Sequence, residues 1–187
     1  MKKKSTMFRM TSCALMAAVM CALCPLSLPI GPVPISLAIF VILLTVSILG
    51  PWDAAVSCVV YLLLGAVGMP VFTGFQGGLA KLAGPTGGYL AGYLPMILVS
   101  GLFIRKAKEN LWLTMLGMVL GVAVDYALGT AWFVFQAQST WAHALAVCVY
   151  PFIPFDLGKI VLAALLGKAI RTALRKAKLL ALEENVE

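Results

Sequence analysis

The stretch GAVGMPVFTGFQGGLAKLAGPTGGYLAGY, residues 65–93, lies between two long apolar runs and decides how this chain folds. Glycine occurs six times between residues 74 and 88, and each glycine costs ordering entropy, so this density excludes a continuous regular helix. Apolar side chains such as Phe72 and Phe75 argue against a disordered linker. Irregular backbone at membrane depth survives only against protein or a water-filled cavity. We therefore predict an ordered external loop, about residues 68–86, that covers a ligand.

The composition is that of an integral membrane protein. Of the 187 residues, 62% are hydrophobic and only 11% are charged, and the mean hydropathy is +1.02. A soluble domain averages about a quarter charged residues. At this length we expect one membrane domain, residues 1–187, embedded in the lipid bilayer.

The net charge of +7 comes from clusters of basic residues at predicted helix ends. Twelve of the fourteen Lys and Arg residues lie in residues 2–9, 105–108 and 168–178. This distribution follows the positive-inside rule and does not favour nucleic-acid binding. It predicts a multi-pass protein of the plasma membrane with both termini in the cytoplasm. The two remaining cations, Lys81 and Lys159, stand apart from every cluster.

The apolar runs predict an all-α bundle of six transmembrane helices. Their expected ranges are about 8–24, 35–49, 54–67, 87–103, 111–135 and 152–174. The N-terminus has features of a signal peptide, but Arg9 interrupts its basic region and Pro25 follows its apolar run, so we expect an uncleaved first helix. Residues 25–34, which contain four prolines, predict a stiff extended crossing, and residues 142–150 a re-entrant or interfacial segment.

Small residues mark helix faces that allow close packing. Ala14, Ala18 and Ala22 recur at every fourth position of the first helix, so another helix could approach them closely. That partner is either a separate protein or the interior of the same bundle. In the fifth predicted helix, three glycines form similar notches, namely Gly117, Gly121 and Gly129.

Charged residues inside the predicted helices are candidates for function. Asp156 and Lys159 are three residues apart and therefore share a helix face. A charge at the centre of a bilayer helix costs about 3 kcal/mol, so such residues usually face a cavity. The pair either presents an acceptor and a donor to a polar ligand or only neutralises itself. Asp125 has the same two interpretations, since the hydroxyls of Thr130 or Tyr126 could satisfy it.

The residues support no metal site, cofactor site or catalytic centre. Five cysteines are scattered through apolar runs, and Cys21 and Cys24 have no further ligand residue near them in the sequence. The chain has a single histidine, His143. The segment GPTGG lacks the Lys-Ser/Thr of a phosphate-binding loop, so the chain has no ATPase motif. We expect a protein that is not an enzyme.

Two long motifs resemble those of one known family. GMPVFTGFQGGLAKLAGPTGGYLAGY (residues 68–93), followed by PFIPFDLGK (residues 151–159), closely resembles BioY, the biotin-binding membrane subunit, or S component, of energy-coupling factor (ECF) transporters. The resemblance covers nearly the whole chain. It implies high-affinity capture of biotin on the outer face, and uptake that depends on a transmembrane coupling subunit and a pair of cytoplasmic ATPases.

The resemblance also implies which residues contact biotin. The expected set is Gln76, Gly77 and Gly78 against the ligand, Tyr89 and Tyr93 as walls, and Asp156 and Lys159 as charged contacts, with Lys81 and Asp125 as further candidates. Biotin offers two ureido N–H donors, a carbonyl acceptor and a carboxylate. A protein carboxylate can accept from the ureido group, and Lys159 or Lys81 can meet an acceptor oxygen. Which lysine meets which group stays open.

Two other functions compete with this one. An S component for a different vitamin would keep the helices and the alanine pattern, but the two long motifs do not favour it. An intramembrane enzyme could use Asp125, Asp156 and Lys159 for proton transfer. The sequence contains no nucleophile or metal set for such an enzyme.

Overall fold

The computed structural model describes residues 2–28, 34–107 and 110–176 and consists mainly of helices. In chain order the elements are α1 (Lys2–Leu23), β1 (Ser27–Leu28), β2 (Ile35–Ser36), α2 (Ala38–Leu49), α3 (Pro51–Ala66), α4 (Leu79–Ala83), α5 (Gly87–Ala107), α6 (Leu111–Ala137), α7 (Trp141–Cys148) and α8 (Ile153–Lys176). The helical class is as predicted. The two strands and the short helix α4 were not predicted.

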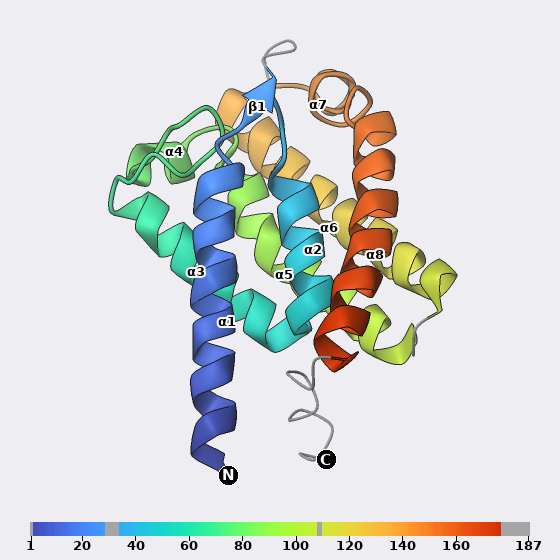
Figure 1. Ribbon diagram of the computed structural model, residues 1–187. Coiled ribbons are helices and arrows are strands. Elements are labelled where there is room, and N and C mark those ends of the chain that lie inside the picture. Colours follow the sequence, from blue (N-terminus) through green and yellow to red (C-terminus); the bar gives the residue numbers. More distant parts are fainter. Residues whose placement is uncertain (1, 29–33, 108–109, 177–187) are drawn as a thin grey trace.

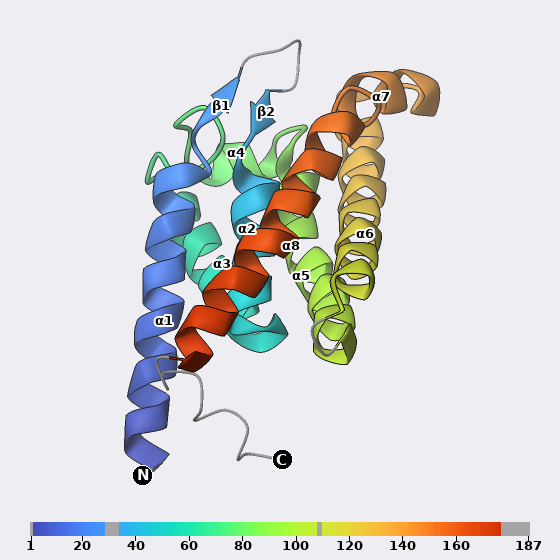
Figure 2. The same cartoon turned by 45° about the vertical axis from the view of Figure 1, so that its right-hand side comes forward.

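The long helices run between two ends of the molecule (Figure 1). The start of α1 and the end of α8 lie together at one end, whereas β1, β2, α4 and α7 gather at the other, and the turned view in Figure 2 shows the same grouping. We call the second end the loop end. The glycine-rich loop and the start of α8, which are far apart in the sequence, therefore share one end of the bundle.

The sequence explains where several helices begin and end. Gly50 ends α2 with φ of 80°, and its N–H donates to the carbonyl of Val46. Pro51 then opens α3 at a position where its missing N–H costs nothing. Asn110 caps α6, because its side chain accepts hydrogen bonds from the backbone N–H groups of Trp112 and Leu113.

The proline-rich segment is not the extended crossing that the sequence predicts. Ser27 pairs with Ser36 and Leu28 with Ile35 in an antiparallel register, so the chain reverses direction there. The predicted second helix also began too early, because residues 35–36 form β2. Unpaired backbone groups at this depth are costly, and pairing the two short segments satisfies them. The part of the predicted crossing at residues 29–33 lies outside the described residues.

Glycines allow α5 and α6 to pack closely. A Cβ atom at Gly121 would lie 2.0 Å from Ser100 Oγ and 2.8 Å from the carbonyl oxygen of Met96. A Cβ at Gly117 would lie 2.2 Å from Phe103 Cβ. Gly129 makes the same kind of contact with the ring of Tyr89. The predicted close-packing notches are confirmed, and they join α6 to α5.

The outer faces of the helices are apolar. Exposed large hydrophobic side chains lie on α3, α5, α6 and α8 and include Val59, Leu63, Leu102, Leu120, Leu128, Leu162 and Leu165. An apolar exterior of this extent is typical of a protein in lipid. Among the described residues, three helices are long and apolar enough to cross a membrane, or four if α7 and α8, which meet at 49°, form one span. Because α2 and α3 are shorter apolar helices, the six-span count stays a prediction.

An ion pair fixes α1 to α3 at the end opposite the loop. Arg9 donates to both carboxylate oxygens of Asp53, at 2.9 Å from Nε and 2.6 Å from Nη2. Asp53 lies in the first turn of α3 and is only 8% exposed. A two-point arginine–carboxylate contact fixes orientation as well as distance, so it sets the height of α1 along α3.

Gly121→Val should destabilise the bundle by about 1–3 kcal/mol, because its side chain would overlap Ser100 and the backbone of α5. The matched control is Ala123→Val on the same helix, at an exposed position. Thermal unfolding of the two purified variants in detergent measures the difference. Equal midpoints would contradict the close α5–α6 contact.

Candidate ligand-binding site

The glycine-rich loop is anchored by one aromatic side chain. Phe72 is fully buried, and its ring meets that of Tyr61 edge-on with centroids 5.6 Å apart. Gly65 of α3 makes room for it, since a Cβ there would lie 2.1 Å from the Phe72 ring. The loop is therefore packed into the bundle at this point, as its apolar composition predicts.

Backbone hydrogen bonds shape the segment that follows Phe72. The N–H groups of Phe72 and Gln76 each donate to the other residue's carbonyl, at 2.8 and 3.2 Å, and so close a tight turn. Within it, Gly74 adopts a φ of 75° and donates to the carbonyl of Pro25, which precedes β1. Phe75 is held at a φ of 56°, which is strained for a residue with a side chain. The turn fixes Gln76 two residues after this contact with the segment before β1, whose antiparallel pair with β2 is called the hairpin below.

The backbone of the loop requires glycine at positions 77 and 78. A Cβ at Gly77 would lie 2.2 Å from the carbonyl oxygen of Met69, so the backbone passes too close for any side chain. Gly78 has a φ of 91°, which disfavours residues with a Cβ, and its N–H donates to the carbonyl of Gly65 at 2.7 Å. The sequence identified the two glycines but not these internal contacts.

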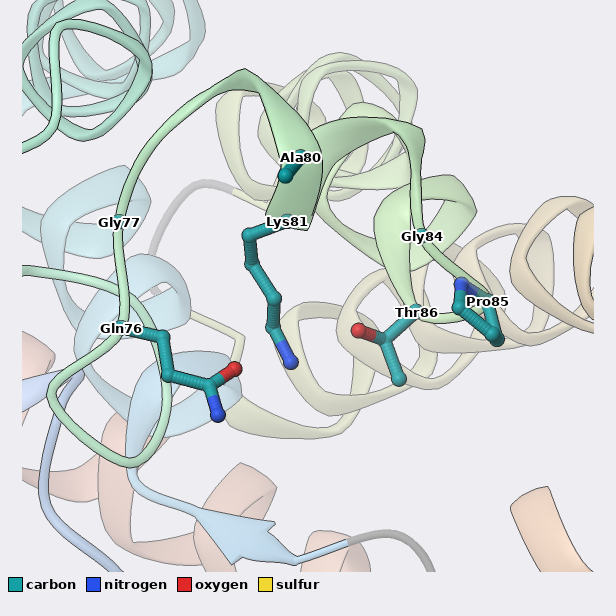
Figure 3. A pocket seen from close by; sticks show the side chains of 7 residues that line it. All are labelled: Gln76, Gly77, Ala80, Lys81, Gly84, Pro85 and Thr86. Atoms are coloured by element: carbon teal, nitrogen blue, oxygen red, sulfur yellow. The ribbon is translucent and has the colours of Figure 1, made fainter.

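A pocket of about 470 Å³ lies in this loop (Figure 3). Its lining comprises Gln76, Gly77, Ala80, Lys81, Gly84, Pro85 and Thr86. Figure 3 shows the side chains of Gln76, Lys81 and Thr86 converging on the same space. Three predicted site residues, Gln76, Gly77 and Lys81, thus share one pocket. Gly78, Tyr89 and Tyr93 are not part of its lining.

The charged pair of α8 forms the centre of a second polar cluster. Lys159 Nζ donates to Asp156 Oδ1 at 2.7 Å and to the carbonyl of Ser36 in β2 at 2.8 Å. The other Asp156 oxygen accepts a hydrogen bond from the hydroxyl of Tyr126 in α6. Asp156 is 2% exposed, so this network is buried. It joins α8, α6 and the hairpin at the loop end.

The two predicted wall tyrosines lie on the inner side of α5. Tyr93 is buried in the core, and the hydroxyl of Tyr89 pairs with that of Thr130 in α6 at 3.0 Å. Trp132, two residues further along α6, donates from its indole Nε1 to the carbonyl of Gly84 at 2.9 Å. Through this contact α6 holds the loop at Gly84, directly after α4.

Asp125 is buried among the described residues without a hydrogen-bond partner for either oxygen. Its side chain points at α5, where a Cβ on Gly92 would lie 2.3 Å from Asp125 Oδ1. The hydroxyls that the sequence offered as partners are used elsewhere, since Thr130 pairs with Tyr89 and Tyr126 with Asp156. Asp125 therefore stays a candidate for contact with a ligand.

This chain is similar to proteins of one known family. The BioY family matches residues 1–176. This chain belongs to the BioY family. Among curated BioY proteins, a biotin transporter from Thermotoga maritima is 39% identical over 146 residues, which cover 78% of this chain and 85% of the relative. Biotin transporter BioY2 from Lactococcus lactis is 33% identical over 172 residues, covering 92% of this chain and 94% of the relative.

A solved structure has the same fold. The crystal structure of the S-component for biotin from an ECF-type ABC transporter matches with a TM-score of 0.85 and 31% identity. The match covers 92% of this chain and 95% of the solved chain. The predicted family and helical membrane fold are confirmed. The BioY relatives are named as transporters, in agreement with the prediction of a non-enzymatic function.

Sequence reasoning missed three residues of the candidate site. Ser36 was placed inside a helix, so its carbonyl could not be expected beside Lys159. Tyr126 was considered only as a partner of Asp125, its neighbour in the sequence. Thr86 carried a detectable signal, because it lies within the GPTGG motif next to the pocket.

The alanine face of α1 points away from the bundle. Ala14, Ala18 and Ala22 are all exposed, whereas the buried positions of this helix include Cys13, Met16, Ala17 and Met20. The alternative in which the alanines pack inside the same bundle is therefore wrong. The face is open to lipid or to another protein.

Gly77→Val and Gly78→Val should each open the loop, the first by collision with Met69 and the second by backbone strain of about 1–3 kcal/mol. The matched control is Ala83→Val, at an exposed position of α4. The rate of protease cleavage within residues 68–86 measures the opening. Wild-type rates in both glycine variants would contradict the close packing of this loop.

Proposed function

We propose that this chain is the membrane subunit that captures biotin for an ECF transporter. The observation that supports this proposal most strongly is the structural match, over 92% of the chain, to a solved S-component for biotin. The loop end adds polar chemistry, with polar side chains in the pocket and a buried ion pair at the same end of the bundle. An equilibrium binding assay with labelled biotin and competing vitamins tests the proposal, and stronger binding of another vitamin would contradict it.

In this proposal the ligand lies between the loop and the helices of the loop end. The side-chain amide of Gln76 can both donate to and accept from a polar group of the ligand. Tyr89 and Tyr93 contribute aromatic surface toward the thiophane ring, with Gly77 and Gly78 as close backbone contacts. The Asp156–Lys159 pair supplies the charged contacts from α8, and Asp125 is a further acceptor.

The proposed orientation places the loop end outside the cell. The basic clusters of the sequence include Arg105 and Lys106 at the end of α5 and Arg175 and Lys176 at the end of α8. These helix ends lie opposite the loop end (Figure 1). By the positive-inside rule they face the cytoplasm, together with both termini, in a single plasma-membrane domain of six spans.

We further propose that α1 docks on the transmembrane coupling subunit, which works with a pair of cytoplasmic ATPases. Three exposed alanines in one stripe allow a second helix backbone to approach closely, which is how helices gain packing energy in lipid. No polar group on this stripe takes part in the loop-end networks. Binding of the vitamin and docking on the partner therefore use separate surfaces.

Asp156→Asn should weaken biotin binding by at least about 1.5 kcal/mol, roughly tenfold, because it removes a charged contact in a desolvated site. The matched control is Asp53→Asn, which changes another buried, paired carboxylate at the opposite end. Titration of labelled biotin onto the folded, monodisperse fraction of each variant gives the affinities. Wild-type affinity in folded Asp156→Asn protein would exclude Asp156 from the site.

Ala18→Trp should abolish association with the coupling subunit while leaving biotin affinity within about twofold of wild type, because one bulky side chain holds two helices apart. The control is Ala127→Trp, at an exposed position of α6. Binding and co-purification are measured on the same preparation. Intact co-purification of Ala18→Trp would rule out docking through this face.

A further inference from the structure

The two lysines outside the basic clusters differ in what they contact. Lys159 is committed, because Asp156 neutralises its charge and the Ser36 carbonyl takes a second of its three donors. Lys81 of α4 has no hydrogen-bond or ion-pair partner among the described residues, and its side chain points into the loop pocket. One ammonium is therefore already paired within the protein, and the other is free to meet a ligand.

The groups around Lys81 are those of an anion site. Its ammonium lies between the amide of Gln76 and the hydroxyl of Thr86 (Figure 3). All three side chains can donate hydrogen bonds, and the pocket lining contains no carboxylate that would compete for them. Partial burial lowers the pKa of Lys81 from its ordinary value, because burial disfavours the charged ammonium, and a bound anion would offset that cost.

Hydrogen bonds hold the residues on both sides of α4, the short helix that carries Lys81. On the N-terminal side, Gly78 is bonded to Gly65 of α3, directly before the first residue of α4. On the C-terminal side, the Trp132 indole holds the Gly84 carbonyl, directly after the last residue of α4. The short helix that carries Lys81 is thus clamped between α3 and α6. Preorganisation of this kind reduces the entropy lost when a ligand binds.

We propose that Lys81, with Gln76 and Thr86, binds the carboxylate of the ligand and makes the protein selective for the free acid. The inference rests on the proposed function, because it takes biotin as the ligand. It assigns the two lysines different roles. Lys81 recognises the acidic tail, while Lys159 stays paired with Asp156 in the charged pair of α8.

The test compares biotin with biotin methyl ester, which keeps the ureido and thiophane rings but lacks the negative charge. Wild-type protein should bind biotin about tenfold more tightly than the ester, the value of one charge-assisted contact. Lys81→Met should bind the ester as wild type does and biotin about tenfold more weakly, so that the preference disappears. Lys81→Arg should keep a preference for biotin. The matched control, Lys106→Met, changes an exposed lysine at the opposite end and should behave as wild type.

Three results would overturn the assignment. They are an unchanged preference in Lys81→Met, an equal loss of both ligands in folded Lys81→Met protein, and the absence of any preference in wild type. Failure of the proposed function looks different, because wild-type protein would then bind neither biotin nor its ester. Chromatographic monodispersity and the thermal midpoint of each variant show that folded protein is being compared.

Discussion

The buried ion pair between Asp156 and Lys159 is the interaction on which the loop end depends. Each charge would cost several kcal/mol if it were left alone in this environment, and neither is alone. Lys159 reaches β2 through the Ser36 carbonyl, and Asp156 reaches α6 through the Tyr126 hydroxyl. Three elements that are distant in the sequence are therefore held together by the need to satisfy two charges. Removing one partner would leave the other buried and unpaired, so the arrangement permits few alternatives.

The loop obeys a different constraint. It is ordered because Phe72 is buried against Tyr61 while glycines admit the backbone, and hydrogen bonds of Gly78 and Gly84 hold it to α3 and α6. The apolar residues of this stretch were sufficient to predict order. Its shape was not predictable, because Gly77 is required by the Met69 carbonyl and Gly78 by its own positive φ. A sequence shows that a glycine is present, but the contact that requires it exists only in the folded chain.

In the bundle, too, features set by local sequence were predicted, and features set by contacts in the folded chain were missed. Long apolar runs determine helices through local periodicity, and Gly50 and Pro51 marked one boundary correctly. Strands of two residues carry no such periodicity, since the pairing of Ser27 with Ser36 is stable only beside the rest of the bundle. For Asp125 the sequence offered two hydroxyl partners, and packing directs both to other groups. The order of residues along α6 could not reveal this, because Asp125 and Tyr126 face different helices.

The exposed face of α1 follows from the physics of packing in lipid. In a bilayer, burying alanine between helices gains no hydrophobic free energy, because lipid tails are equally apolar. The free energy of helix association therefore comes from van der Waals contact between closely packed backbones. The bundle already uses this principle internally, where Gly121 and Gly129 bring α6 against α5. On α1, Met16 and Met20 turn inward, whereas Ala14, Ala18 and Ala22 are left outside together with Leu15. Leucine and valine side chains cover much of the exterior elsewhere, although α6 also exposes alanines at every fourth position, namely Ala123, Ala127 and Ala131. A stripe of small side chains lets a second helix approach closely, and on α1 this stripe is separate from the polar groups of the loop end.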